Sequence, residues 1–179
     1  MQTGRTHRRA APDRKVRGMS ITLKLKPLTC AEFAPFGDVL EVAGDPDKII
    51  NAGMCGRYHD RANIECDGGA AGISLFKSQA RSLPITLDMM ERHPDGSQAF
   101  LPMSMDPFVV VVAPDDNGKP GQPRAFITTV GQGVNYKKNT WHGVLTPLHE
   151  PGLFAVIDRI GEGPNLQEHW FETPFLIEG

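Results

Sequence analysis

The sequence predicts a single, mainly β domain, folded as a sandwich or a barrel with few short helices. Short runs rich in β-branched and aromatic residues recur along the chain, and 19 glycines and 15 prolines punctuate them. No segment has the sustained apolar periodicity of a long helix. At 179 residues, the chain suits one domain and is long enough to bury a substantial core. Many short strands with turn signals between them are typical of sandwiches and barrels.

The first predicted strand covers residues 21–28, where apolar and polar residues alternate. Thr29 and Glu32 have the spacing of a capping box, so a short helix should begin there, and Gly37 can end it. Three further short strands are expected from their composition, at residues 38–42, 48–51 and 72–79.

A strongly apolar run at residues 108–113 predicts the central strand. Its sequence, Phe-Val-Val-Val-Val-Ala, is apolar on both faces, as in a strand that is buried on both sides. Four more strands are expected around it, at residues 87–92, 98–103, 124–130 and 153–158. A His-Pro-Asp-Gly turn at residues 93–96 separates the first two. The loop at 114–123 makes 124–130 the antiparallel partner of the central strand.

The charge of the chain is uneven. Residues 1–18 carry a net charge of +5 and the remainder carries −7, within a total of −2. We expect this basic segment to be a disordered extension rather than a targeting peptide or a nucleic-acid-binding arm, because it has no apolar stretch and Met19 offers a second start. Residues 19–179 then form the single catalytic domain.

Cysteine usage and apolar content indicate a cytoplasmic protein. Cys30, Cys55 and Cys66 are odd in number and form no C-x-x-C pair, which favours reduced cysteines over a disulfide framework. The longest apolar run, at residues 108–113, is far too short to span a membrane. We therefore expect no membrane partner. We expect no nucleic-acid partner either, because the only basic segment is 18 residues long.

Reactive side chains gather at the ends of the predicted strands, beside glycines that allow tight turns. The clusters lie at residues 91–100, 132–142 and 157–159, with a weaker one at 51–60. Taken singly, each fits a structural role such as a surface ion pair or a packed aromatic residue. A barrel mouth would bring strand ends together, so we expect the clusters to form one site there.

Two of these clusters resemble the paired motifs of the cupin barrel. Residues from Gly131 to His142 have the form of the second motif, a glycine-containing turn that ends in a histidine. Glu91 and His93 fall where the first motif has His-x-His, and Gln98 falls where it has a glutamate. The resemblance implies a cupin-like antiparallel β-barrel or jelly-roll sandwich, with His142 directed into its mouth.

A closer resemblance rests on several segments taken in order. They are residues 28–41, 57–60, 91–103, 108–113, 124–128, 132–136, 141–142 and 157–159. Together they resemble the ureidoglycolate lyase family, also known as ureidoglycolate hydrolase, over residues 21–172. The resemblance implies a cupin-like homodimer that acts late in allantoin breakdown, in purine and nitrogen metabolism. It also implies cleavage of ureidoglycolate to glyoxylate and urea.

The chemistry of this substrate suggests which residues act on it. One carbon of ureidoglycolate bears a hydroxyl, a carboxylate and a ureido nitrogen, and cleavage removes the hydroxyl proton as urea leaves. This needs a base, a proton donor and a cation for the carboxylate. Histidine titrates near neutral pH, so we predict His142 and His93 as catalytic, with Glu91 orienting them, sharing a proton or ligating a metal. Which histidine is the acid and which the base stays open.

Substrate binding requires further side chains. Candidates for the carboxylate are Arg159, Lys137 and Arg57. Alternation along a strand would put Glu91 and His93 on one face and turn Arg92 away from them. The other predicted binding residues are Gln98, Asn135 and Tyr136, which would bind the ureido group, and Phe100 and Trp141, which would form an apolar wall that excludes water from it.

The altered first motif leaves open whether the protein binds a metal cofactor. If a divalent ion such as nickel or manganese is present, we expect Glu91, His93, Gln98 and His142 to hold it. The ion would lower the pKa of the substrate hydroxyl. Acid–base groups alone also suffice for this elimination, so no cofactor is required.

Two other functions are compatible with the same fold. One is a different enzyme on the same barrel, such as an amidohydrolase that releases ammonia from ureidoglycolate or a metal-dependent dioxygenase. The other is a non-catalytic sensor of a small molecule, since a fold does not determine a function. The reaction products distinguish these alternatives.

Overall fold

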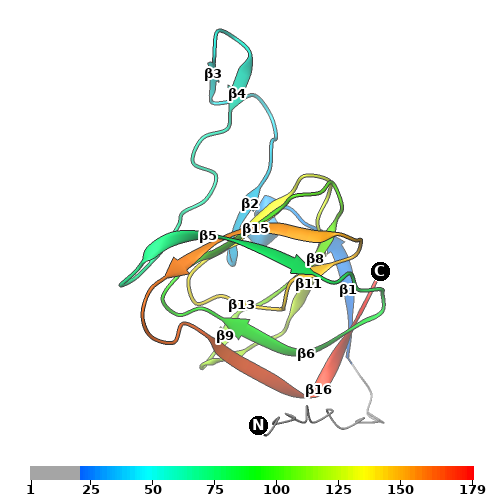
Figure 1. Ribbon diagram of the computed structural model, residues 1–179. Coiled ribbons are helices and arrows are strands. Elements are labelled where there is room, and N and C mark those ends of the chain that lie inside the picture. The colour runs from blue at the N-terminus through cyan, green and yellow to red at the C-terminus, as the bar shows by residue number, and fades with distance from the viewer. Residues whose placement is uncertain (1–20) are drawn as a thin grey trace, which may run out of the picture.

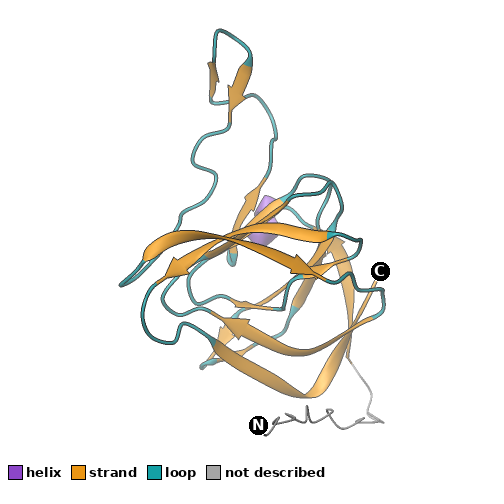
Figure 2. Ribbon diagram, in the orientation of Figure 1, coloured by secondary structure: helices purple, strands orange, loops and turns teal. Residues whose placement is uncertain are grey.

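The computed structural model describes residues 21–179, which form a β structure with one short helix, α1 (Cys30–Phe33) (Figure 2). This agrees with the cupin-like, mainly β fold expected from the sequence. The predicted extension at residues 1–18 lies outside the described residues. Thr29 caps α1 as predicted, with its hydroxyl oxygen accepting from the backbone N–H of Glu32. The helix of the described chain is much shorter than a membrane span.

Six strands close into a barrel (Figure 1). Their order around it is β11 (Arg124–Ile127), β1 (Ile21–Pro27), β16 (Gln167–Glu178), β6 (Ile85–Arg92), β13 (Trp141–His142) and β8 (Phe108–Ala113), and β8 pairs back with β11. The short β14 (Thr146–Pro147) extends this sheet beside β8. The sequence predicted an antiparallel barrel, and this was wrong in one respect. The barrel is mixed, because β1 runs parallel to both of its neighbours.

A five-stranded antiparallel sheet packs against one side of the barrel. Its order is β2 (Gly37–Leu40), β12 (Gly133–Tyr136), β7 (Gln98–Pro102), β15 (Gly152–Ile160) and β5 (Ala70–Ser78). Strand β5 lies at one edge, where its only partner in the described chain is β15. Residues of three of the four clusters of reactive side chains lie on this sheet, which holds them next to the barrel wall.

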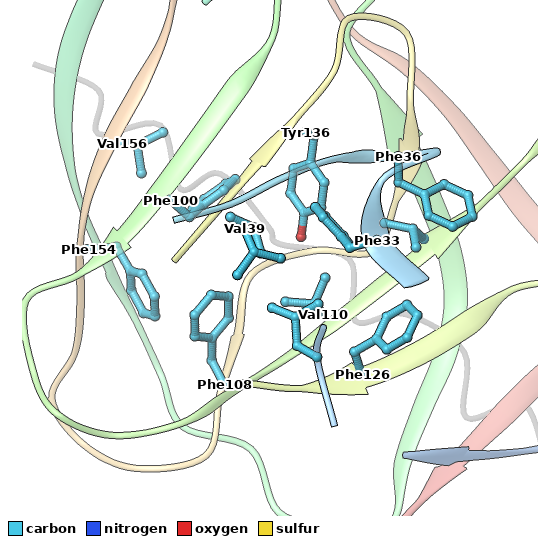
Figure 3. Close-up of a cluster of buried hydrophobic side chains, with 13 residues drawn as sticks. Phe33, Phe36, Val39, Phe100, Phe108, Val110, Phe126, Tyr136, Phe154 and Val156 are labelled. Carbon is cyan, nitrogen blue, oxygen red and sulfur yellow. The ribbon is translucent and has the colours of Figure 1, made fainter. Parts of the chain in front are cut away.

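Two apolar clusters form the core, and strand β8 contributes to both. Phe108, Val110 and Val112 face the five-stranded sheet, where they join a largely aromatic layer (Figure 3). The alternate residues of β8 point into the barrel, which side chains from all six of its strands fill. The prediction of a central strand that is apolar on both faces is therefore confirmed, since its two faces meet two different cores.

Two hairpins leave the body. One joins β9 (Asp115–Asp116) to β10 (Lys119–Pro120), and the other joins β3 (Lys48–Ile50) to β4 (Cys55–Arg57). The second hairpin sits at the tip of an arm, residues 41–69, that projects from the body between β2 and β5 (Figure 1). Hydrogen bonds within the arm hold its shape: the Tyr58 hydroxyl donates to the Gly44 carbonyl at 3.0 Å, and the His59 N–H donates to Asp47 at 2.8 Å.

Three local predictions were wrong. The stretch from Gly131 to His142 is not simply a glycine-containing turn, because it contains the fully buried strand β12 and the short β13. The last strand, β16, was missed, since polar residues, Pro174 and a register shift between Trp170 and Phe175 break its pattern. Gly37 does not end the helix, which stops at Phe33. It opens β2, where a Cβ atom would overlap the Asn135 carbonyl oxygen.

Candidate active site

The three predicted catalytic side chains converge where the barrel meets the five-stranded sheet. Glu91 lies at the end of β6, and His142 on β13 is its register partner, so the two side chains leave the barrel wall on the same face. His93 follows β6 directly, and its ring lies 5.3 Å from that of His142. Possible ligand atoms of Glu91, His93 and His142 lie within 4.8 Å of one another.

Backbone carbonyls orient both imidazole rings. The Nδ1 atom of His93 lies 2.7 Å from the Asn165 carbonyl oxygen, and that of His142 lies 3.1 Å from the Gly143 carbonyl oxygen. A carbonyl only accepts, so each Nδ1 carries the hydrogen and each Nε2 keeps a lone pair. Both Nε2 atoms are buried and have no hydrogen-bond partner among the described residues. Each is therefore free to accept a proton or bind a metal ion.

Burial sets the protonation of the neighbouring groups. It lowers the pKa of His142 to about 3, and the nearby His93 contributes to this lowering, so His142 is neutral at physiological pH. Burial raises the pKa of the Glu91 carboxyl, an effect that His93 partly offsets. The site thus combines a neutral imidazole with a carboxyl group whose pKa is shifted toward neutrality.

Aromatic rings form one wall of the site. The Tyr136 ring stacks on His142, with ring centres 4.3 Å apart and planes 2° from parallel. Phe100 packs edge-on against Tyr136 at 5.8 Å, and Phe76 packs edge-on against Phe100 at 6.0 Å. Burial raises the pKa of Tyr136, so its hydroxyl stays protonated. The rings fix the plane of His142 and keep water from its face.

Two buried oxygens face the same space from the five-stranded sheet. Gln98 is the register partner of both Tyr136 and Asp158, so the three side chains share a face. Gln98 Oε1 and Asp158 Oδ1 are buried without a hydrogen-bond partner in the described chain. Asp158 was not among the predicted site residues, because its neighbour Arg159 was the better candidate in the sequence.

A groove opens beside Glu91. It has a volume of about 450 Å³, and its lining residues are Phe76, Lys77, Ser78, Arg81, Glu91, Val144 and Leu145. Another cavity of about 450 Å³ lies beside β1 and β11, but it contains none of the converging residues. The groove therefore provides the approach to the site, and its lining includes apolar side chains and Arg81, a cation that the sequence did not single out.

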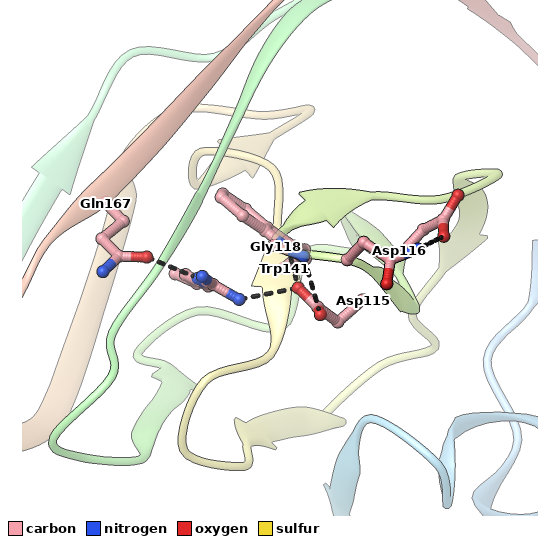
Figure 4. A network of polar contacts seen from close by, with 7 residues as sticks. Asp115, Asp116, Gly118, Trp141 and Gln167 are labelled. Carbon is pink, nitrogen blue, oxygen red and sulfur yellow. Dashed lines mark hydrogen bonds and ion pairs between the residues drawn. The ribbon is translucent and has the colours of Figure 1, made fainter.

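Trp141 and Arg92 lie on the opposite side of β13, away from the histidines. Trp141 packs in the barrel core, and its indole N–H donates to Asp115 at 2.9 Å (Figure 4). Arg92 lies over the Trp141 ring at 4.5 Å and also bonds to Asp115, at 2.7 Å, and to Gln167, at 2.8 Å. The alternation argument was right for Arg92, but the same argument removes Trp141 from the predicted substrate wall.

The cations predicted to bind the carboxylate are engaged elsewhere. Arg159 donates to the carbonyls of residues 67, 68 and 162, and Lys137 donates to the Ala34 carbonyl at 2.6 Å. Arg57 lies on the projecting arm, 2.8 Å from the His59 ring nitrogen. The structure brings none of the three to the groove.

Asn135 is also directed away from the site. Its amide nitrogen donates to Asp38 at 3.0 Å and to the Asn63 carbonyl at 3.1 Å. Neighbours on a strand point to opposite faces, so Tyr136 faces the histidines and Asn135 faces the arm.

Comparisons with known proteins show which family the sequence is similar to. The sequence profile of one family, described as ureidoglycolate lyase, matches residues 20–178. The chain is 58% identical over 158 residues to the ureidoglycolate lyase of Rhodobacter capsulatus, covering 88% of this chain and 98% of the relative. It is 54% identical over 160 residues to ureidoglycolate lyase 2 of Rhizobium meliloti, covering 88% and 98%. It is 53% identical over 154 residues to the ureidoglycolate lyase of Chelativorans sp., covering 85% and 93%.

Proposed function

The chain belongs to the ureidoglycolate lyase family, and from that premise we propose how its side chains cleave the substrate. It is a carbon–nitrogen lyase that converts ureidoglycolate to glyoxylate and urea. The observation that carries the assignment of residues is the convergence of Glu91, His93 and His142 within 4.8 Å. Two imidazole lone pairs and a carboxyl group of raised pKa supply the proton transfers that this elimination needs.

Glu91 takes the proton of the substrate hydroxyl. It is the one residue of the catalytic trio that lines the groove, so the bound substrate meets it first. Its raised pKa makes it a stronger base than an exposed glutamate. As the proton leaves, the oxygen electron pair forms the carbonyl of glyoxylate, and the carbon–nitrogen bond breaks with its electrons going to the ureido nitrogen.

The histidines return that proton to the leaving nitrogen. His93 and His142 each keep a buried Nε2 lone pair and lie beside Glu91, so a proton can pass from the carboxyl group through an imidazole. Because the pKa of His142 is lowered to about 3, His142 carries the proton only transiently. The ureido nitrogen then departs as the amino group of neutral urea. One proton has moved from hydroxyl to nitrogen, and the side chains end as they began.

Gln98 and Tyr136 bind the ureido group in this proposal. Gln98 has a buried amide oxygen without a partner in the described chain, which suits the N–H groups of urea. The Tyr136 hydroxyl is kept protonated by its raised pKa and can donate to the urea oxygen. Phe100 excludes water from these bonds, which strengthens them.

A divalent metal ion fits the same trio of residues. Glu91, His93 and His142 offer one carboxylate and two imidazole nitrogens, a donor set that suits first-row divalent ions such as nickel and manganese, and Gln98 is the candidate fourth ligand. Carbonyl-oriented histidines with free Nε2 atoms are common around metal sites. A bound ion would polarise the substrate hydroxyl. Elemental analysis of the purified protein and its thermal shift with added nickel or manganese would test this, in parallel with an H93A variant.

Product stoichiometry tests the function itself. Fresh ureidoglycolate is incubated with enzyme, with and without a chelator, and glyoxylate, urea and ammonia are followed together. A sample without enzyme corrects for spontaneous breakdown. Equal glyoxylate and urea are expected. Ammonia in place of urea would indicate an amidohydrolase, and no enzyme-dependent product would contradict catalysis on this substrate.

The protein acts as a homodimer in this proposal. The support is the outer face of the five-stranded sheet, where Leu75 and Leu101 flank Ala155 in one cross-strand row. Ile73 is 78% exposed and Leu75 is 68% exposed, on an edge strand whose only partner in the described chain is β15. An apolar sheet face of this kind suits a second copy of the chain.

A cytoplasmic location is also part of the proposal, as is the absence of a nucleic-acid partner. Cys30, Cys55 and Cys66 are free thiols, which suits a reducing compartment. The chain outside residues 1–18 is acidic overall, which disfavours binding to a phosphate backbone.

A further inference from the structure

The substrate carboxylate needs a cation, and the groove offers one that sequence reasoning did not consider. Arg81, in the loop before β6, lines the groove with Glu91. Its side chain forms no ion pair or hydrogen bond within residues 21–179. Lys77, near the end of β5, also borders the groove, but alternation along the strand turns its side chain to the outer face of the sheet with Leu75. The other candidates, Arg57, Lys137 and Arg159, are held away by their own contacts.

Hydrogen bonds to β14 and to the residues on either side of it hold the end of β5 and the loop that carries Arg81 at the groove. The Arg81 N–H donates to the Pro147 carbonyl at 2.9 Å, and the Ala80 N–H donates to the Glu150 carboxylate at 2.9 Å. The Ser78 hydroxyl donates to the Leu145 carbonyl at 3.4 Å. A cation on an anchored backbone loses less entropy on binding than one on a free loop.

We propose that Arg81 binds the carboxylate of ureidoglycolate; this assignment rests on the proposed function of the site. An arginine fork matches both carboxylate oxygens. The carbon next to that carboxylate bears the hydroxyl, so anchoring it at Arg81 directs the hydroxyl along the groove toward Glu91. The positive charge of Arg81 also offsets the repulsion between the substrate carboxylate and the Glu91 carboxylate.

The apolar lining strengthens this interaction. Phe76, Val144 and Leu145 line the groove together with Arg81 and Glu91. Bound substrate covers these partly exposed side chains and displaces water from around its carboxylate, and a charge-assisted hydrogen bond is stronger there than in bulk water. The same arrangement predicts a preference for substrates that carry a carboxylate beside the reacting carbon.

Steady-state kinetics of Arg81→Gln test the proposal. KM should rise roughly 10- to 100-fold with a much smaller change in kcat, since a hydrogen-bonded charge pair is lost. Arg81→Lys should recover part of the loss, and Lys77→Gln should have a smaller effect. Arg124→Gln, on strand β11 beside the other cavity, is the matched control and should keep the wild-type KM.

Titration with glyoxylate tests the same contact without turnover. Calorimetry should show weaker glyoxylate binding to Arg81→Gln by a similar factor, with circular dichroism to confirm the fold. Wild-type KM and glyoxylate affinity in a folded Arg81→Gln protein would overturn the assignment. If the wild-type enzyme releases no urea, the proposed function fails instead, and the glyoxylate titration still decides whether Arg81 binds a carboxylate.

Discussion

At the scale of residues, the site depends on two imidazole rings whose Nδ1 atoms are committed to backbone carbonyls. The distances of 2.7 Å at His93 and 3.1 Å at His142 leave both Nε2 atoms for chemistry. The sequence could predict that Glu91, His93 and His142 lie together, because the cupin-like spacing puts them at neighbouring strand ends. It could not reveal Asp158, which the pairing of β7 with β15 places beside Gln98, or Arg81, whose backbone the Pro147 carbonyl holds beside the groove.

Replacing His142 tests its part in proton transfer. His142→Ala should lower kcat by roughly 10² or more, because a positioned acid–base group contributes that much. Measured turnover of ureidoglycolate with urea detection gives the rate. His149→Ala, at an exposed loop position, is the control and should keep wild-type turnover. Near wild-type activity of His142→Ala would remove this histidine from the mechanism.

Burial of His142 also makes stability depend on pH. Its pKa is about 3 in the folded protein and near 6.5 in the unfolded chain, so only the unfolded state binds a proton between these values. Stability should therefore fall as the pH drops from 6.5 toward 3, by up to several kcal/mol on the order-of-magnitude scale of such shifts.

Urea unfolding across this pH range, with a chelator present, measures the effect. His142→Gln should flatten the acid branch of the stability curve, because glutamine does not titrate. Glu91 contributes with the opposite sign, since its raised pKa means that acidification relieves the cost of its buried charge. A variant curve parallel to that of the wild type would contradict the assignment of the acid loss to His142.

At the scale of elements, strands with regular patterns were predictable and irregular ones were not. Strand β8 carries an unbroken apolar run because each of its faces meets a core. Strand β16 alternates poorly, since much of its length is exposed and its register shifts beside Pro174. Strand β12 was hidden by its buried polar Asn135, which bonds to Asp38 on β2 and to Asn63 in the arm instead of water.

The start of β2 depends on a glycine at position 37. A Cβ atom there would overlap the Asn135 carbonyl oxygen, so Gly37→Ala must force β2 away from β12. We expect a loss of about 3 kcal/mol or more in the free energy of unfolding.

Chemical denaturation of both proteins checks this loss. Gly44→Ala is the matched control: its backbone has a positive φ of 69°, but no atom lies within 4 Å of the added Cβ. It should cost only about 1 kcal/mol, from backbone strain alone. Equal losses in the two variants would show that the close approach at Gly37 is not the cause.

At the scale of the whole molecule, a barrel and an open sheet pack together, and the site lies at their junction. The barrel wall supplies Glu91 and His142, whereas the sheet supplies Gln98, Tyr136 and Asp158. The outer face of that sheet is left exposed at Ile73, Leu75 and Leu101. Composition and patterning predicted the fold class, but which sheet face stays uncovered depends on pairings between distant strands.

A charge on that face should disrupt the proposed dimer. Leu75→Glu is expected to shift the protein from dimer to monomer in light scattering after size exclusion, because a carboxylate would be buried against the second copy. Val130→Glu introduces the same charge at another exposed position, 61% accessible, and should leave the dimer intact. A folded Leu75→Glu protein that stays dimeric would place the interface elsewhere.

The position of β1 between β11 and β16 determines when the barrel can close during protein synthesis. Strand β16 follows every other barrel strand in the chain, whereas the five-stranded sheet is complete once Ile160 has emerged from the ribosome. The sheet can therefore assemble while translation continues, but β1 lacks one neighbour until the final strand is released. A nascent chain halted before residue 167 should present the apolar barrel interior to water, which makes it a substrate for chaperones.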